Sequence, residues 1–279
     1  MNSLGQKKRN SRCHVLVALF SMFVLPACTQ SEQPSEDESN VSIPIETVFN
    51  GEVLGCDATL NIQSHQWQLS QLAYFVSSVE VRFDTEQWHQ VDFIVSDWQT
   101  SQTALVWFPR DCGQAQSLTA NTQLILALSQ QEWDTVTALR FELGVPFETN
   151  HQNPLTQPSP LNISEMFWSW QMGHKFVRLD MLTQSDALGT VSWSYHLGSI
   201  GCQSASKMRS PSEPCSQSNM TQHTLVNRAQ SGGLRFDLSA LLNNINPAEQ
   251  RGCMFHHAHE VSCPVLTQNL LSNTVFTWQ

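Results

Sequence analysis

Two single histidines lie where an imidazole ring could be fixed as a metal ligand. His151 ends the segment Gly144-Val-Pro-Phe-Glu-Thr-Asn-His151, and His196 ends an apolar segment shortly before Gly198 and Cys202. Turn-forming neighbours can hold such a ring by hydrogen bonds to the backbone, as a ligand requires. The alternatives are a surface turn for His151 and a solvated strand position for His196.

A third group of histidines lies in a short segment between two cysteines, Cys253 and Cys263. It consists of His256, His257 and His259. Such a tract can bind Cu(II), Ni(II) or Zn(II). The metalloprotease motif HExxH is absent, because His259-Glu260 is followed by Val, Ser and Cys. Whether this segment binds metal or is an exposed loop without a task stays open at this stage.

Tryptophan is concentrated in one segment, Met166-Phe-Trp-Ser-Trp170, which holds two of the nine tryptophans of the chain. It is followed by Gly173-His-Lys-Phe176. If this stretch is extended, alternation places Trp168 and Trp170 on one face. The segment is therefore either a core strand or a site whose chemistry needs tryptophan.

The elements that must position these residues are predicted to be strands. Short segments rich in Val, Leu, Phe and Trp, bounded by turn formers, occur at residues 72–83, 89–95, 104–108, 123–127, 137–145, 174–181, 191–197 and 224–227. Alternation of apolar with charged residues in Val79–Phe83 is typical of a half-buried antiparallel strand. In the segment 191–197, alternation places His196 with Ser194 on one face.

Helical periodicity is limited to Asp237–Asn243, where Asp237 could cap a short helix, and to residues 161–168. We therefore predict an all-β fold, a single antiparallel β-sandwich with long loops, of which residues 146–160 form the longest.

Disulfides are expected to staple this fold. Apart from Cys13 and Cys28, the chain has six cysteines: Cys56, Cys112, Cys202, Cys215, Cys253 and Cys263. An even number in an exported chain is typical of disulfides, although six cysteines allow fifteen pairings. We favour the close pairs Cys202–Cys215 and Cys253–Cys263, which leaves Cys56 for Cys112. A zinc site is the competing interpretation, but no spacing is C-x2-C.

The N-terminal segment, residues 1–28, is typical of an export signal. Four basic residues precede the apolar run Val15–Val24, which is too short to span a bilayer. The sequence Leu25-Pro-Ala-Cys28 resembles the bacterial lipobox, in which the cysteine is lipidated. An ordinary secretory signal is the alternative, and both predict export. Because no Asp follows Cys28, the rule for enterobacterial lipoproteins favours a periplasmic protein anchored in the outer membrane.

Residues 29–42 are polar and acidic and are predicted to form a disordered tether before a folded domain at 43–279. Loss of the four basic signal residues from the 14 in the chain leaves 10 Lys and Arg against 24 Asp and Glu, a formal charge of −14. Nucleic acid is therefore not expected as a partner. No Gly-x-Ser-x-Gly elbow, phosphate loop or haem-attachment motif occurs.

Four segments in one order carry a family resemblance. They are Gly-Val-Pro-Phe-x-x-Asn-His (144–151), Pro-Leu-Asn (160–162), Met-Phe-Trp-Ser-Trp with Gly-x-Lys-Phe-x-Arg (166–178) and His-Leu-Gly-Ser-x-Gly-Cys (196–202). Together they resemble the MbnP family, also named metallo-mystery-pair four-Cys-motif proteins. These are exported copper-binding proteins found beside a diheme enzyme of the cytochrome c peroxidase and MauG type.

The resemblance implies that a partner haem enzyme oxidises a tryptophan to kynurenine, which helps histidines to bind Cu(I). It points to Trp168 or Trp170 as the modified residue and to His151 and His196 as ligands. Two departures leave the ligand set open. The chain has Gly-His174-Lys-Phe where the family usually has Gly-Tyr-Lys-Phe, so His174 becomes a further candidate, and the segment between Cys253 and Cys263 differs from the family's.

The sequence thus predicts a lipid-anchored copper-binding protein for copper acquisition or homeostasis that is not itself an enzyme. Two alternatives from other classes stay open. One is an enzyme that uses histidine-bound copper for oxidative chemistry. The other is a structural or adhesive lipoprotein module in which tryptophans are core residues and no metal binds.

Overall fold

The computed structural model describes residues 40–84, 86–110, 120–185, 189–226, 232–254 and 262–279. The predictions for Cys28, for Cys112 and for the histidines at 256, 257 and 259 lie outside these residues, as does most of the predicted tether. In the part of the chain that is described, no helix has both the length and the hydropathy needed to cross a membrane.

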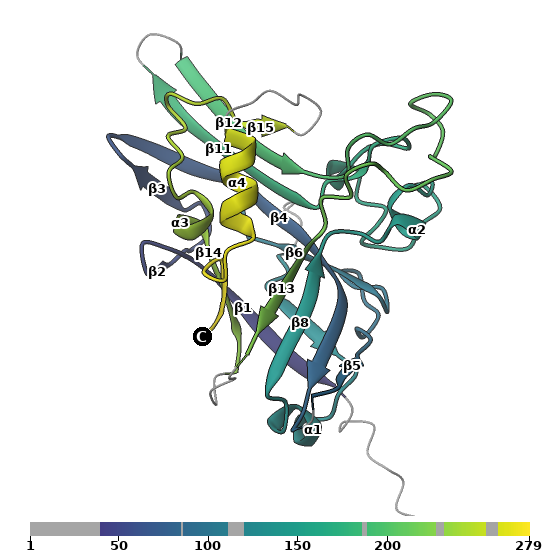
Figure 1. The fold of residues 1–279 in the computed structure, drawn as a ribbon. Coiled ribbons are helices and arrows are strands. Elements are labelled where there is room, and N and C mark those ends of the chain that lie inside the picture. Colours follow the sequence, from purple (N-terminus) through teal and green to yellow (C-terminus); the bar gives the residue numbers. More distant parts are fainter. Residues whose placement is uncertain (1–39, 85, 111–119, 186–188, 227–231, 255–261) are drawn as a thin grey trace, which may run out of the picture. The chain divides into compact units, whose positions relative to one another are not determined.

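The larger sheet is organised around one long strand, β4 (His65–Arg82). Its nine strands comprise the path β13 (Thr221–Leu225), β8 (Ala138–Leu143), β4, β11 (Val177–Ser185), β12 (Gly189–Leu197) and β15 (Cys253–Met254), with β3 (Thr59–Ile62), β5 (Trp88–Gln90) and β6 (Thr103–Trp107) also paired to β4. The first half of β4 pairs with β3 and β11 and the second half with β5, β6 and β8, so the sheet curls around it (Figure 1).

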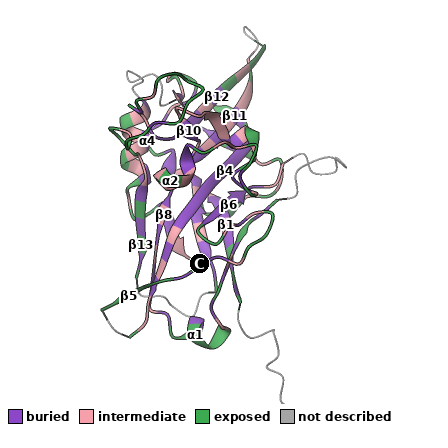
Figure 2. Ribbon diagram, turned by 90° about the vertical axis from the view of Figure 1, so that its right-hand side faces the viewer, coloured by how far each residue is buried: buried purple, intermediate pink, exposed green. Residues whose placement is uncertain are grey.

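The middle of β4 is buried on both faces. Every residue from Gln71 to Ser77 is buried, which Figure 2 shows as a continuous band along the strand. An apolar run of this kind, Leu-Ala-Tyr-Phe-Val, is typical of a strand with cover on both sides. The other strands of the larger sheet are therefore arranged around this buried strand.

The smaller sheet contains five strands in the order β16 (Phe276–Trp278), β14 (Leu234–Asp237), β1 (Val41–Phe49) and β2 (Glu52–Val53), with β7 (Gln123–Leu126) also paired to β1. β1 begins at Val41, slightly before the predicted start of the domain. The fold is mostly β, as predicted, but the sheets are mixed. The expectation of purely antiparallel strands is wrong for β1–β14 and β12–β15, which are parallel. Alternation of apolar residues is the same for both directions, so it could not reveal this.

An aromatic cluster joins the two sheets. Tyr74 of β4 stacks on Phe236 of β14 at a ring distance of 5.0 Å, and Phe141 of β8 meets Phe276 of β16 edge-on at 5.1 Å. Edge-on and offset pairs are each worth about 0.5–1.5 kcal/mol beyond the area they bury. The cluster therefore contributes to the packing between the two sheets.

Helices are short and lie between the strands. They are α1 (Gln130–Asp134), α2 (Phe147–Asn150), α3 (Leu238–Leu241), α4 (Ser262–Leu270) and the 3-10 turn η1 (Ser164–Met166). The Asp237 cap is confirmed, since its side chain accepts hydrogen bonds from the N–H groups of Ser239 and Ala240. α4 was not predicted. Apolar residues occupy few of its positions, and its buried residues are Ser262, Leu266 and Leu270.

The two close disulfides are confirmed. Cys202 is bonded to Cys215, and Cys253 to Cys263. Cys56 is also disulfide-bonded, whereas the predicted partner Cys112 is outside the described residues.

A buried histidine in the aromatic cluster makes the stability of the fold depend on pH. His223 of β13 stacks on Phe141 at 5.5 Å and meets Phe276 at 4.7 Å, and burial lowers its pKa from 6.5 to about 4. The unfolded chain therefore binds a proton more readily than the folded one between these values. We expect His223 to remove about 3 kcal/mol of stability as the pH falls from 7 to 4.

Urea unfolding measured at steps between pH 7 and pH 4 tests this expectation. His223→Phe should flatten the dependence of the unfolding free energy on pH, while the exposed control His65→Gln should leave it unchanged. An identical pH slope in wild type and His223→Phe would show that the prediction is wrong.

Candidate metal centre

Asn150, the last residue of α2, fastens two histidines. Its side chain is 1% exposed, and its Oδ1 accepts a 2.7 Å hydrogen bond from the backbone N–H of His174. Because that N–H can only donate, the amide must turn its Nδ2 the other way, where it lies 3.2 Å from Nε2 of His151. Gly173 has a φ of +74°, and a Cβ at this position would collide with the side-chain amide of Asn150.

These contacts determine the tautomer of His151. Its Nε2 accepts the hydrogen bond of Asn150, so its proton is on Nδ1, which donates to the carbonyl of Trp170 at 3.1 Å. The ring is 3% exposed. Burial lowers the pKa of His151, and the bond to the Trp170 carbonyl opposes this only in part. His151 is therefore a neutral ring whose Nε2 lone pair has a fixed direction.

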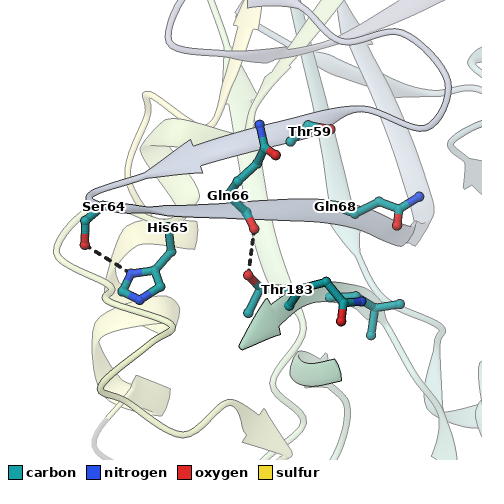
Figure 3. A pocket seen from close by; sticks show the side chains of 8 residues that line it. Thr59, Ser64, His65, Gln66, Gln68 and Thr183 are labelled. Carbon is teal, nitrogen blue, oxygen red and sulfur yellow. Dashed lines mark hydrogen bonds between the residues drawn. The ribbon is translucent and has the colours of Figure 1, made fainter. Parts of the chain in front are cut away.

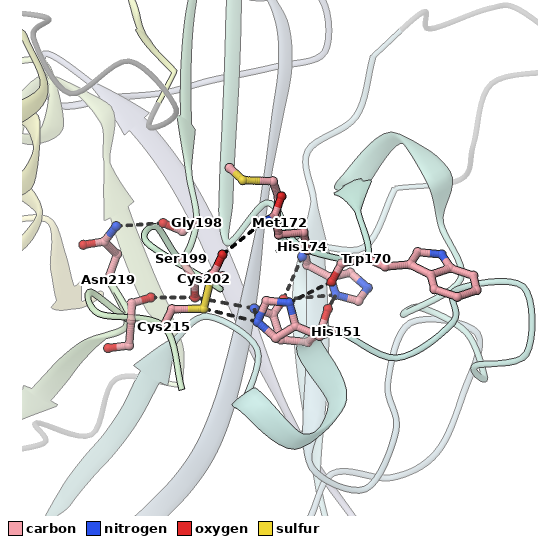
Figure 4. Close-up of a disulfide and its surroundings, with 12 residues drawn as sticks. His151, Trp170, Met172, His174, Gly198, Ser199, Cys202, Cys215 and Asn219 are labelled. Atoms are coloured by element: carbon pink, nitrogen blue, oxygen red, sulfur yellow. Dashed lines mark hydrogen bonds between the residues drawn. A yellow bond between two sulfur atoms is a disulfide. The ribbon is translucent and has the colours of Figure 1, made fainter. Parts of the chain in front are cut away.

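The Cys202–Cys215 disulfide lies beside this ring, as Figure 4 shows. Sγ of Cys215 is 3.5 Å from Nε2 of His151, and the ligand atoms of His151, Cys202 and Cys215 all lie within 4.8 Å of one another. The sulfur atoms are bonded to each other, and thiolates, not disulfides, are the usual sulfur ligands of metals. In this state His151 is the strong donor of the group.

His196 is fixed by a carboxylate on the neighbouring strand. Its Nε2 lies 2.8 Å from Oδ1 of Asp180, which also accepts a 2.6 Å hydrogen bond from Ser194. Ser194 and His196 therefore share one face of β12, as predicted, but His196 is only 7% exposed. Alternation identified the face of the strand but not the burial of the His196 side chain.

A chain of alternating charges continues from Asp180. Its Oδ2 accepts from Nε of Arg178 at 2.7 Å, and Arg178 also donates to Glu165, which pairs with Arg110. Burial alone would raise the pKa of Asp180, but the hydrogen bonds from His196 and Ser194 and the positive charge of Arg178 outweigh it and hold the pKa well below its ordinary value. Asp180 is therefore ionised, and its carboxylate accepts a hydrogen bond from Nε2–H of His196.

The second ring nitrogen of His196 carries the lone pair. With Nε2–H donating to Asp180, the lone pair of the neutral ring is on Nδ1, and within the described part of the chain this buried atom has no hydrogen-bond partner. Buried polar atoms are nearly always paired. A histidine held by a carboxylate on one side with a free nitrogen on the other is the usual arrangement of a metal ligand.

The two tryptophans differ in what they offer. Trp168 lies in β9 (Phe167–Ser169), and its ring is 6.5 Å from that of His196. Trp170 starts the turn between β9 and β10 (Gly173–His174), so the expected alternation across both residues fails. Its carbonyl faces His151 while its indole points away (Figure 4).

His174 is placed close to His151 but is occupied. Its Nδ1 lies 2.9 Å from the carbonyl of Asn150, and its Nε2 lies 2.9 Å from the carbonyl of Leu161. Burial lowers its pKa, and the two carbonyls oppose the change. Since both ring nitrogens face backbone oxygens, neither offers a lone pair to an ion. The ring instead ties β10 to the loop before η1.

Asn150, Asp180 and Gly198 were missed as site residues by sequence reasoning. Asp180 is two residues after Arg178 on a predicted strand, which was a usable signal, because such residues share a face. Gly198 could be found only from the structure, where a Cβ at this position would collide with the ring of Trp168.

A polar groove elsewhere on the large sheet does not include these residues. It has a volume of about 460 Å³ and is lined by Gln66 and Gln68 of β4 and by neighbouring side chains of β3 and β11 (Figure 3). Two hydrogen bonds join its lining residues, from the Thr183 hydroxyl to the Gln66 carbonyl and between Ser64 and Nδ1 of His65. The groove offers no carboxylate or cysteine.

A mostly β domain in which one buried histidine lies near a tryptophan ring and another lies beside a disulfide is a candidate metal-binding protein. The family model MbnP matches residues 38–255, which is most of the chain. The chain therefore belongs to the MbnP family.

A solved structure supports the fold. MbnP from Methylosinus trichosporium matches with a TM-score of 0.69 and 23% sequence identity, covering 81% of this chain and 86% of that one. At this identity the likeness concerns the fold alone. Comparison with curated proteins gives no match.

The packing of Trp168 on Gly198 can be tested by adding one methyl group. In Gly198→Ala the new Cβ would overlap the Trp168 ring and lie 2.9 Å from the His174 carbonyl oxygen. We expect the unfolding free energy to fall by about 1–3 kcal/mol and the near-UV circular dichroism of tryptophan to change. Gly55→Ala, where no atom lies within 4 Å, is the matched control. Equal behaviour of the two variants would contradict the packing described here.

Proposed function

We propose that this protein binds copper as Cu(I) and holds it with His196, His151 and a kynurenine formed from Trp168. The observation that carries the proposal is the buried Nδ1 of His196, which has no hydrogen-bond partner among the described residues, in a ring that lies 6.5 Å from the ring of Trp168. Neutral imidazole is a good copper ligand, and a buried, partly apolar position with few ligands favours the reduced ion. His151 would bind through Nε2 in exchange for its hydrogen bond to Asn150.

Kynurenine supplies what tryptophan lacks. The indole nitrogen is a donor only and has no lone pair for a metal. Oxidative cleavage of the C2–C3 bond, with C2 leaving as formate, turns the ring into an aniline with an adjacent ketone. We propose that a diheme partner of the cytochrome c peroxidase and MauG type provides the oxidising equivalents. Trp168 is favoured over Trp170, because its ring, and not only its carbonyl, neighbours a histidine.

The proposed setting is the periplasm, with Cys28 as the lipidated residue and the outer membrane as the anchor. There the protein would serve copper acquisition or homeostasis and catalyse no reaction of its own. The acidic chain, with 24 Asp and Glu, suits an exported protein that handles cations.

Mass spectrometry of the protein produced with and without the haem partner tests the role of tryptophan. The peptide that contains Trp168 should gain one oxygen and lose one carbon only when the partner is present, together with bound copper. Trp170→Phe should keep both changes, whereas Trp168→Phe should lose both. Copper bound to protein with unmodified tryptophans would show that histidines alone form the site. Copper-dependent oxidation of a substrate would favour an enzyme. No metal and no modification would leave a structural module.

The role of Asp180 is tested by Asp180→Asn. An amide can donate to Nε2 of His196 and so move the ring proton to Nδ1, which removes the lone pair proposed to bind copper. We expect Cu(I) affinity, measured by competition with a chromogenic chelator, to fall about 10–100-fold. The exposed Asp92→Asn should have no effect. A folded Asp180→Asn protein with unchanged affinity would exclude His196 as a ligand positioned in this way.

A further inference from the structure

The disulfide beside His151 holds two sulfur atoms in a position to become ligands. Cys202 is buried and Cys215 half-buried, and Sγ of Cys215 is 3.5 Å from Nε2 of His151. In zinc sites the metal lies about 2.3 Å from sulfur and about 2.0 Å from nitrogen. Three donor atoms within 4.8 Å of one another therefore need only small shifts to share one ion.

The backbone keeps the two cysteines together without help from the S–S bond. Ile200 and Gln217, which lie just outside them, exchange hydrogen bonds of 3.0 and 3.2 Å, and the Ser216 N–H donates to the Gly201 carbonyl at 3.4 Å. These hydrogen bonds lie directly before Cys202 and directly after Cys215, so they close the loop between the two cysteines at its base. Cleavage of the S–S bond would leave the two sulfur atoms close to each other.

The histidine is held in place independently of the disulfide as well. Nδ1 of His151 donates to the Trp170 carbonyl, and the hydroxyl of Ser210 donates to the carbonyl of His151. Gln171 also donates through Nε2 to the Cys202 carbonyl at 3.1 Å, which ties the cysteine to the same turn. The nitrogen and the two sulfur positions thus belong to one preorganised group.

We propose that the Cys202–Cys215 disulfide is a redox gate for a second, soft-metal site formed by Cys202, Cys215 and His151. A dithiol reductant gives two electrons and two protons to the S–S bond and becomes a disulfide itself. A metal ion such as Zn²⁺ or Cd²⁺ then displaces the two thiol protons and binds two thiolates and one imidazole. Such a donor set suits soft and borderline ions.

This site shares His151 with the proposed copper site but needs neither kynurenine nor His196. In the oxidised protein His151 is available to copper, and in the reduced protein the two sulfurs claim it. The redox state of one disulfide would thereby decide which donor set His151 joins.

Cadmium titration of the mature protein tests the proposal. The protein is treated anaerobically with a dithiol, which is then removed by gel filtration, and Cd²⁺ is added while the sulfur-to-cadmium charge-transfer absorption in the ultraviolet is recorded. Reduced wild type should show the band, and oxidised protein should not. Alkylation followed by peptide mass spectrometry identifies the cysteines that were reduced.

Three variants localise the site. Cys202→Ser with Cys215→Ser should abolish the band, and His151→Gln should weaken Cd²⁺ binding at least about tenfold. Cys253→Ser with Cys263→Ser, a disulfide outside the group, is the matched control and should retain the band. Circular dichroism and urea unfolding establish whether each variant is folded. If the double serine variant does not fold, His151→Gln alone tests the site.

The proposal is overturned if reduced wild type shows no band although Cys202 and Cys215 are alkylated. It is also overturned if His151→Gln binds Cd²⁺ as tightly as wild type, or if the control variant alone loses the band. Copper uptake is measured separately on oxidised protein, so failure of the copper proposal leaves these outcomes unaffected.

Discussion

The buried amide of Asn150 is the interaction on which the site depends. Its oxygen must accept from the backbone of His174, and this one requirement orients the nitrogen toward His151 and thereby fixes the proton of that ring. A buried partner left unsatisfied costs about 1–3 kcal/mol. The amide therefore cannot turn without loss, and it transmits the position of β10 to a histidine that lies far away in the sequence.

His196 is fixed by a different device, a row of charges across strands. In the register of β11 with β12, Arg178 pairs with His196 and Asp180 with Ser194, which aligns the carboxylate with the imidazole. Arg178 stands between two carboxylates, so each charge has an opposite neighbour. Paired in this way, half-buried charges orient their neighbours, although they need not stabilise the fold.

The sequence predicted the residues that depend on local alternation and missed those that depend on distant contacts. Most strands of the larger sheet, the face of His196, the Asp237 cap and the two close disulfides could be inferred from neighbours in the chain, whereas β1, β14 and β16 of the smaller sheet were not predicted. The parallel pairs, the helix α4 and the role of Asn150 could not, because each depends on a partner more than twenty residues away. The expectation that Trp168 and Trp170 share one face failed for a local reason. The strand ends at Ser169, and Trp170 begins the turn that continues through Gln171 and Met172.

The pairing of β1 with β14 has a consequence for the order of folding. Ile45 of the first described strand lies beside Leu234, and β16 then pairs on the other edge of β14. Pairings of such large sequence separation form late and slowly, because the loop between them must be closed first. The smaller sheet is therefore incomplete until the C-terminal strands are available, and until then β1 has only β2 and β7 as partners within that sheet.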